Sequence, residues 1–153
     1  MKKKDYRILE HILDYCEDIS SSISRFGSDF SDFEDDIHYR HAVSMCVLQI
    51  GELANNLSDE YRDETKTLIP WKEIRGMRNI LAHNYGESDT NTLWNTIIYD
   101  IPTVADFCKN QIEQYKKSIN PSIPLEEIIT NANARKASPK ESSLGPKDTL
   151  KKH

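Results

Sequence analysis

Residues 6–26 read YRILEHILDYCEDISSSISRF, and this stretch decides the class of fold. Charged side chains such as Glu10 and Asp14 fall between its apolar positions. The apolar side chains recur alternately three and four residues apart, at Leu9, Ile12, Cys16, Ile19, Ile23 and Phe26. This spacing gathers them on one side of an α-helix. The sequence therefore predicts a long amphipathic helix whose apolar side must be buried against other parts of the chain.

Three further stripes of apolar residues have helical spacing. They run from Val43 to Leu57, from Trp71 to Leu81 and from Leu93 to Tyr115. Gly27-Ser28-Asp29 separates the first two helices, and a polar loop is predicted around residues 58–67. Since no segment alternates as a strand does, we predict an all-α fold, an antiparallel bundle of four to five helices.

Two prolines and a change in composition subdivide the chain. Pro70 suits the first turn of the third helix, whereas Pro102 lies inside the fourth, where it removes a backbone hydrogen bond and is expected to bend the helix. From Asn120 onward Pro, Ser, Lys and Asn dominate. We predict a helical bundle over residues 1–118 and a largely flexible C-terminal extension over 119–153.

Charge is distributed unevenly along the sequence. Residues 1–115 hold 12 Lys and Arg against 21 Asp and Glu, a balance of −9, whereas residues 116–153 hold 8 against 4, a balance of +4, which together give −5. An acidic body argues against broad binding to duplex nucleic acid, so any nucleic-acid chemistry would need a local basic patch. With no run of about 18 apolar residues and no signal peptide, a soluble, cytoplasmic protein is expected.

Neither the cysteines nor the histidines outside residues 69–86 favour a metal site. Cys16, Cys46 and Cys108 are odd in number and lack C-x-x-C spacing, which predicts reduced thiols. His38 and His41 are three residues apart, as metal ligands on one helical side would be. Because no carboxylate or cysteine has the usual partner spacing, a solvated surface is favoured and no cofactor is expected.

Residues 69–86 read IPWKEIRGMRNILAHNYG and concentrate chemically useful side chains. Arg78 and His83 are five residues apart, about 140° around a continuous helix, so they would not converge on one phosphate. Either the helix ends before His83, or a second copy of the chain completes the site. The Asn84-Tyr85-Gly86 that follows favours an ending near His83, and a dimer axis beside the helix would bring two Arg/His sets together.

These residue types suit cleavage of RNA without a metal. The RNA 2′-hydroxyl supplies the nucleophile, so the enzyme needs a proton carrier and a fixed positive charge. His83 can move protons near neutral pH, Arg78 can hold phosphate oxygens, and Asn79 could orient the phosphate or the histidine. By themselves, however, such residues are more often ordinary surface groups, because an Arg/His pair at this spacing is common.

The second helix carries Gly51-Glu52, and each residue has two interpretations. A glycine inside a helix usually marks the close approach of another helix, and this packing role is favoured for Gly51. Glu52 is either an ordinary surface acid or a residue that faces the site and orients Arg78.

The segment Arg78-Asn79-Ile80-Leu81-Ala82-His83-Asn84-Tyr85 resembles the signature of the HepT-like family of HEPN toxins. Further similarities occur in the same order over roughly residues 5–115. They are Ile50-Gly51-Glu52, Ile69-Pro70-Trp71, Gly76-Met77, Leu93-Trp94-Asn95-Thr96-Ile97 and Asp100-Ile101-Pro102.

The resemblance implies a helical homodimer whose motifs face each other across a cleft and which cleaves RNA without metal, leaving a 2′,3′-cyclic phosphate. It implies catalytic roles for Arg78 and His83, with Asn79 in a supporting position. It also implies half of a type VII toxin–antitoxin pair, in which a minimal, MntA-like nucleotidyltransferase silences the toxin by attaching AMP to a tyrosine, here Tyr85. A bulky, charged adduct there would block phosphate entry.

Two other functions remain as alternatives to the endoribonuclease toxin. One is a non-catalytic HEPN scaffold, or a binding partner of a nucleotidyltransferase, that keeps the arginine and histidine for contact with nucleotide phosphate. The other is a bundle that binds a metal through His38 and His41. RNA cleavage in the presence of a chelator separates the three.

Overall fold

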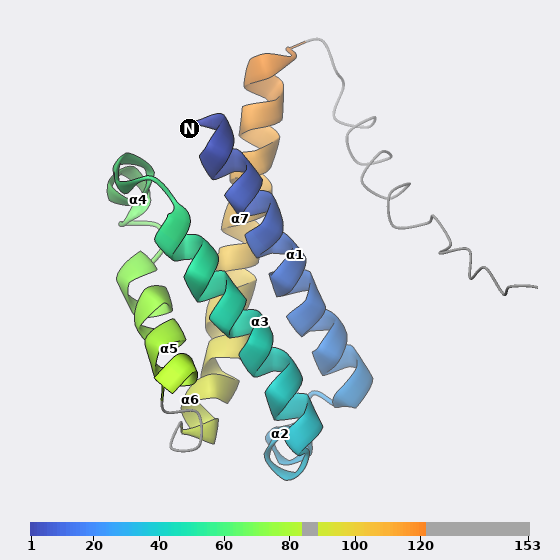
Figure 1. The fold of residues 1–153 in the computed structure, drawn as a ribbon. Coiled ribbons are helices and arrows are strands. Elements are labelled where there is room, and N and C mark those ends of the chain that lie inside the picture. The colour runs from blue at the N-terminus through green and yellow to red at the C-terminus, as the bar shows by residue number, and fades with distance from the viewer. Residues whose placement is uncertain (84–88, 122–153) are drawn as a thin grey trace, which may run out of the picture. The chain divides into compact units, whose positions relative to one another are not determined.

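A computed structural model describes residues 1–83 and 89–121 of the chain (Figure 1). Its regular elements are helices, and no strand occurs in these two ranges. The four long helices are α1 (Lys3–Phe26), α3 (Ile37–Asn56), α5 (Trp71–His83) and α7 (Ile101–Ile119). Helix α3 packs against both α1 and α5, and α7 packs against α1. The predicted all-α helical bundle is therefore confirmed.

Helix α1 buries the stripe that the sequence predicted. Leu9, Ile12, Cys16 and Ile19 are each at most 2% exposed. The helix ends at Gly27, whose φ of 126° is a conformation that L side chains rarely adopt. The Gly27 N–H donates to the carbonyl of Ile23 (3.0 Å), and the Gly27 carbonyl accepts from the Tyr39 hydroxyl (3.0 Å). The break between the first two long helices is thus fixed by a glycine that α3 holds in place.

Short helix α2 (Phe30–Asp35) precedes α3 and buries Phe33. The carboxylate of Asp36 then accepts the backbone N–H groups of His38 (2.8 Å) and Tyr39 (3.2 Å), which caps α3 at its first turn. The last residue of the acidic stretch, Asp36, therefore fixes the start of the second long helix.

The predicted polar loop over residues 58–67 is wrong for most of its length, because Asp59–Thr65 forms helix α4. The Ser58 hydroxyl caps α4 by accepting the Tyr61 N–H, and Tyr61 is buried. Ser58 is itself held by Asp5, whose carboxylate accepts both its N–H and its hydroxyl at 2.8 Å. That contact spans 53 residues and has no local signal in the sequence.

The predicted fourth helix is divided into three consecutive helical segments. These are α6 (Thr90–Asn95), a π-helical turn over Thr96–Asp100, and α7. In the π-helical turn the Ile101 N–H donates to the Thr96 carbonyl, five residues back. Pro102 follows directly and has no N–H to offer to the preceding turn. A wider turn thus precedes the proline in what the sequence predicted as one bent helix.

One compact unit spans Met1–Ile119, while the rest of the predicted extension, from residue 122, lies outside the described residues. No helix of the described ranges is long and apolar enough to cross a membrane. The three cysteines are free thiols, and burial raises the pKa of Cys16 to about 12 and that of Cys46 to about 11. Such thiols stay protonated near neutral pH, and their free state agrees with the predicted reduced cysteines.

Candidate active site

Helix α5 carries the Arg/His motif and is anchored at its first residue. Trp71 is buried, and its ring N–H donates to the Thr65 hydroxyl at 2.8 Å. The carbonyl of Pro70 accepts the N–H groups of Glu73 and Ile74, both at 3.1 Å, so Pro70 stands at the start of the helix as predicted. The start of α5 is therefore fixed to the end of α4.

Helices α3 and α5 approach each other closely at Gly51. A Cβ atom at Gly51 would lie 2.3 Å from the Arg78 Cβ and 3.2 Å from the Ile74 carbonyl oxygen. Neither atom belongs to the free end of a flexible side chain, so neither can move aside easily. The packing role predicted for Gly51 is confirmed, and the residue packed against it is Arg78.

The guanidinium of Arg78 is held by two side chains. Its Nε donates to Glu52 on α3 in an ion pair, and its Nη1 donates to the Asn79 side-chain oxygen at 2.8 Å. The side chains of Arg78 and Glu52 are 35% and 36% exposed, so the pair is open to solvent on one side. Such a pair adds at most about 1 kcal/mol to stability. Its larger effect is to fix where the guanidinium points.

Of the two interpretations of Glu52, the structure favours the one in which it contacts Arg78. The role predicted for Asn79, orienting the phosphate or His83, stays a prediction; in the structure its side-chain oxygen accepts a hydrogen bond from Arg78. Asn79 is also four residues before His83, which places the two residues on the same side of α5. It lies between the two residues of the motif and orients the arginine.

His83 is exposed and is the last residue of α5. The helix is continuous from Arg78 to His83, so the alternative in which it ends before His83 is wrong. The two side chains are about 140° apart around the axis and about 7.5 Å apart along it. A single chain thus directs them to different sides of the helix. Tyr85, the predicted modification site, lies outside the described residues.

A cavity of about 280 Å³ lies between α3, α5 and the π-helical turn, next to Met77. The sequence did not predict it. Its lining is mainly apolar and includes Met77, the residue before Arg78, and Asp100. The hydrophobic periodicity of α5 assigned Met77 to the core, and only the three-dimensional packing shows that the core is incomplete beside it.

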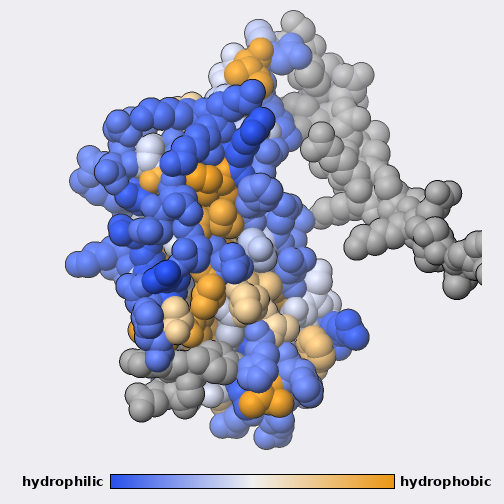
Figure 2. All heavy atoms as spheres, in the orientation of Figure 1, coloured by the Kyte–Doolittle hydropathy of each residue, from blue (hydrophilic) through white to orange (hydrophobic). Residues whose placement is uncertain are grey.

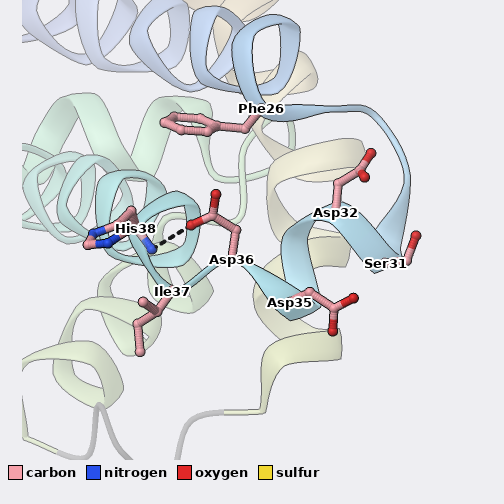
Figure 3. A pocket seen from close by; sticks show the side chains of 7 residues that line it. All are labelled: Phe26, Ser31, Asp32, Asp35, Asp36, Ile37 and His38. Carbon is pink, nitrogen blue, oxygen red and sulfur yellow. Dashed lines mark hydrogen bonds between the residues drawn. The ribbon is translucent and has the colours of Figure 1, made fainter.

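His38 lies in an open, acidic pocket at the start of α3 (Figure 3). Asp32, Asp35 and Asp36 share this pocket, but the Asp36 carboxylate is occupied as the cap of α3. His41 is not among the residues that line it. Within residues 1–83 and 89–121, no group of three His, Cys, Asp or Glu residues could hold a metal ion. The alternative of a metal site at His38 and His41 gains no support.

Comparisons with known proteins agree with the motif. The family model described as "Ribonuclease HepT-like" matches residues 8–111. "Putative RNase TTE0752" of Caldanaerobacter subterraneus is 36% identical over 108 residues, covering 71% of this chain and 94% of the relative. "Probable ribonuclease HepT" of Thermococcus cleftensis is 33% identical over 109 residues, covering 68% and 94%.

A third relative, "Putative RNase MJ1216" of Methanocaldococcus jannaschii, is 32% identical over 120 residues, covering 78% of this chain and 93% of the relative. No solved structure matches the chain. The family match includes α3, α5 and most of α7, and with them Gly51, Arg78 and His83. The chain therefore belongs to the HepT-like ribonuclease family.

Proposed function

We propose that this protein is a metal-independent endoribonuclease, the toxin of a toxin–antitoxin pair, and that two copies of the chain form its active site. The observation that carries the proposal is the arrangement on α5. Arg78 is oriented by Glu52 and Asn79, while His83 is exposed on another side of the same helix. The names of the relatives and the family match support RNA as the substrate.

Arg78 supplies the fixed positive charge. A guanidinium remains protonated at all relevant pH values and matches the oxygens of a phosphate with parallel N–H groups. Two of its N–H groups bind Glu52 and Asn79, so its orientation is set before RNA arrives. Charge positioned in advance stabilises the crowded, more negative phosphorus of the transition state more than the ground state.

His83 moves the proton. The ribose 2′-oxygen attacks the adjacent phosphorus, the bond from phosphorus to the 5′-oxygen breaks, and a 2′,3′-cyclic phosphate and a 5′-hydroxyl result. A neutral imidazole takes the proton from the 2′-hydroxyl, or an imidazolium gives one to the leaving 5′-oxygen. The reaction needs no water, metal or oxidant in this step, because the nucleophile is part of the substrate.

The geometry of α5 favours a site shared between two copies. Because the two side chains are about 140° apart on one helix, His83 of one copy would act with Arg78 of the second. Helices α3 and α5 run in opposite directions (Figure 1), so Met45 on α3 lies toward the His83 end of α5. Met45 is 58% exposed and Ile80 is 47% exposed. These side chains supply apolar surface that a second copy would bury at this end.

The toxin–antitoxin role rests on the family resemblance and on Tyr85, two residues after His83 in the sequence. An AMP group on Tyr85, attached by a partner nucleotidyltransferase, would place a negative phosphate beside the site. That charge would compete with the RNA phosphate for Arg78. Production of the protein with and without its genomic neighbour tests this part, through a mass increase of one AMP that Tyr85→Phe removes.

Cleavage of a single-stranded RNA oligonucleotide in the presence of a chelator tests the enzymatic proposal. We expect cleavage to persist and to yield a 2′,3′-cyclic phosphate, and we expect a 2′-deoxy substitution at the cut position to prevent it. Loss of activity with the chelator would point to a metal. Absence of cleavage combined with stable binding to a nucleotidyltransferase would establish the alternative, a non-catalytic scaffold.

A further inference from the structure

Gly76 lies in the interior of α5, where glycine destabilises a helix relative to alanine. Its φ is not positive, so the backbone conformation does not require glycine. A Cβ atom built there would meet no described atom within 4 Å, so packing against the described residues does not require it either. Among residues 1–83 and 89–121, neither of the usual reasons for a glycine therefore applies. A further reason is the close approach of a binding partner to the helix backbone.

The residues on the same side of α5 as Gly76 indicate which kind of molecule binds there. Lys72, Asn79 and His83 are four residues before, three after and seven after Gly76, which places them on the same side of α5. All three are exposed. We call Lys72, Gly76, Asn79 and His83 the outer stripe. It begins with a cation and ends with the proposed catalytic histidine.

The charge of α5 is opposite to that of the body. Between residues 71 and 83 the helix has Lys72, Arg75 and Arg78 against Glu73 alone, whereas residues 1–115 have 12 basic and 21 acidic residues. Lys72 and Arg75 are exposed, and neither forms an ion pair with a described residue. Their charges are thus available to a polyanion. Figure 2 shows that hydrophilic side chains cover most of the face of the protein seen there.

We propose that the RNA strand next to the cleaved bond lies along the outer stripe, with its sugar–phosphate backbone against Gly76 and one phosphate bound by Lys72. This inference rests on the proposed function. Lys72 is 11 residues from His83, about 16 Å along the helix. Binding would therefore extend several nucleotides beyond the cleaved phosphate. A single strand fits one narrow cationic stripe, whereas a duplex would need a wider basic surface than this acidic body offers.

A second copy of α5 is the competing occupant of the outer stripe. Packing two such stripes antiparallel about Gly76 would place Lys72 opposite Ile80 of the second copy, so the lysine would lose water without gaining a charged partner. Of the apolar side chains proposed for contact between copies, Met45 lies on α3, whereas Ile80 borders the stripe beside Gly76. The lack of a charged partner for Lys72 between two copies therefore favours RNA as the occupant.

The test compares Gly76→Leu and Lys72→Ala with matched controls on α1 and α7. Ser21→Leu adds the same bulk on an exposed part of α1, and Lys109→Ala removes an exposed cation from α7. We expect Gly76→Leu to raise KM about tenfold or more for an oligonucleotide of about 12 nucleotides while kcat changes little. A dinucleotide substrate bound at His83 is too short to extend to Gly76, about 10 Å away along the helix, and should not distinguish Gly76→Leu from the wild type.

Lys72→Ala should weaken binding of the long oligonucleotide and lower the slope of log affinity against log salt by about 0.7, as expected for one lost phosphate contact. Neither control should change KM or the salt slope. An unchanged KM for the long substrate in both variants, with a wild type that cleaves RNA, would overturn the inference and leave the proposed function standing. A Gly76→Leu protein that fails to dimerise in sedimentation would instead assign the stripe to a second copy.

A wild type that does not cleave RNA would contradict the proposed function, and the inference is then tested by binding alone. Fluorescence anisotropy with the same labelled oligonucleotide compares the affinity of the wild type with that of the two variants. Equal affinities would overturn the inference in that case too.

Discussion

Gly51 and Gly76 lie within the same pair of helices, and their surroundings are opposite. A side chain at Gly51 would collide with Arg78, whereas a side chain at Gly76 would meet open space. The first glycine lets α3 and α5 pack closely and places the α3 backbone against Arg78. The second leaves the outer side of α5 without a side chain at a position where no described residue requires it. Gly51, at the inner side of α5, is thus required for helix packing. We propose that Gly76, on the outer side, is required for binding RNA.

His83→Ala should have the largest effect on activity. We expect kcat for RNA cleavage to fall about 10²–10⁴-fold because a general acid–base group is lost. The melting temperature should stay nearly unchanged, because His83 is exposed at the end of α5. His11→Ala on α1 removes an exposed histidine that lies 3.7 Å from Asp14; it is the matched control and should cleave normally. Undiminished cleavage by His83→Ala would remove this residue from the mechanism.

Gly51→Ala should be the most damaging change to the inner side of α5. The new methyl group would force α3 and α5 apart at Arg78 and the Ile74 carbonyl. We expect a loss of about 1–3 kcal/mol in the free energy of unfolding, measured by urea denaturation, and a lower kcat in the protein that remains folded. A protein as stable and active as the wild type would contradict the close approach of the two helices.

Glu52→Gln tests whether the ion pair positions Arg78. We expect kcat to fall about tenfold, because the guanidinium loses its charged partner, while the free energy of unfolding changes by less than about 1 kcal/mol. A double-mutant cycle with Arg78→Lys separates positioning from stability. Additive effects of the two substitutions on kcat would show that Glu52 does not act through Arg78.

Gly76→Ala should have the smallest effect and the opposite sign to Gly51→Ala. Alanine is favoured over glycine inside a helix, so we expect the free energy of unfolding to rise by up to about 1 kcal/mol. A methyl group is small, so KM for a long RNA should rise only modestly. A Gly76→Ala protein less stable than the wild type would mean that something within the chain already occupies that side of the helix.

Local periodicity carried most of the fold prediction. The stripe from Leu9 to Ile19 and the packing role of Gly51 follow from helix geometry, and the structure confirms both. Helix α4 was missed although Ser58 and the acidic residues after it are a local start signal, because the helix has only seven residues and shows little helical periodicity. The π-helical turn was missed because Pro102 indicates a disturbed helix without indicating which hydrogen bonds replace the lost one.

The candidate site could also be predicted only in part, because helix spacing is local and the remaining contacts are not. Spacing along one helix located Arg78 and His83 and showed that they diverge, but it left open whether the helix ended between them. The contact of Asn79 with Arg78 depends on side-chain conformations that no sequence pattern encodes. The composition of a site shared by two copies depends on contacts between chains, which a single sequence does not specify.

The shared site is tested most directly by mixing two inactive proteins, Arg78→Ala and His83→Ala, after dissociation and reassociation of their subunits. If His83 of one copy acts with Arg78 of the second, each mixed dimer regains one intact site out of two. Random mixing makes half of the dimers mixed, so cleavage should return to roughly a quarter of the wild-type rate. A mixture that forms dimers yet stays as inactive as its two components would contradict the shared site.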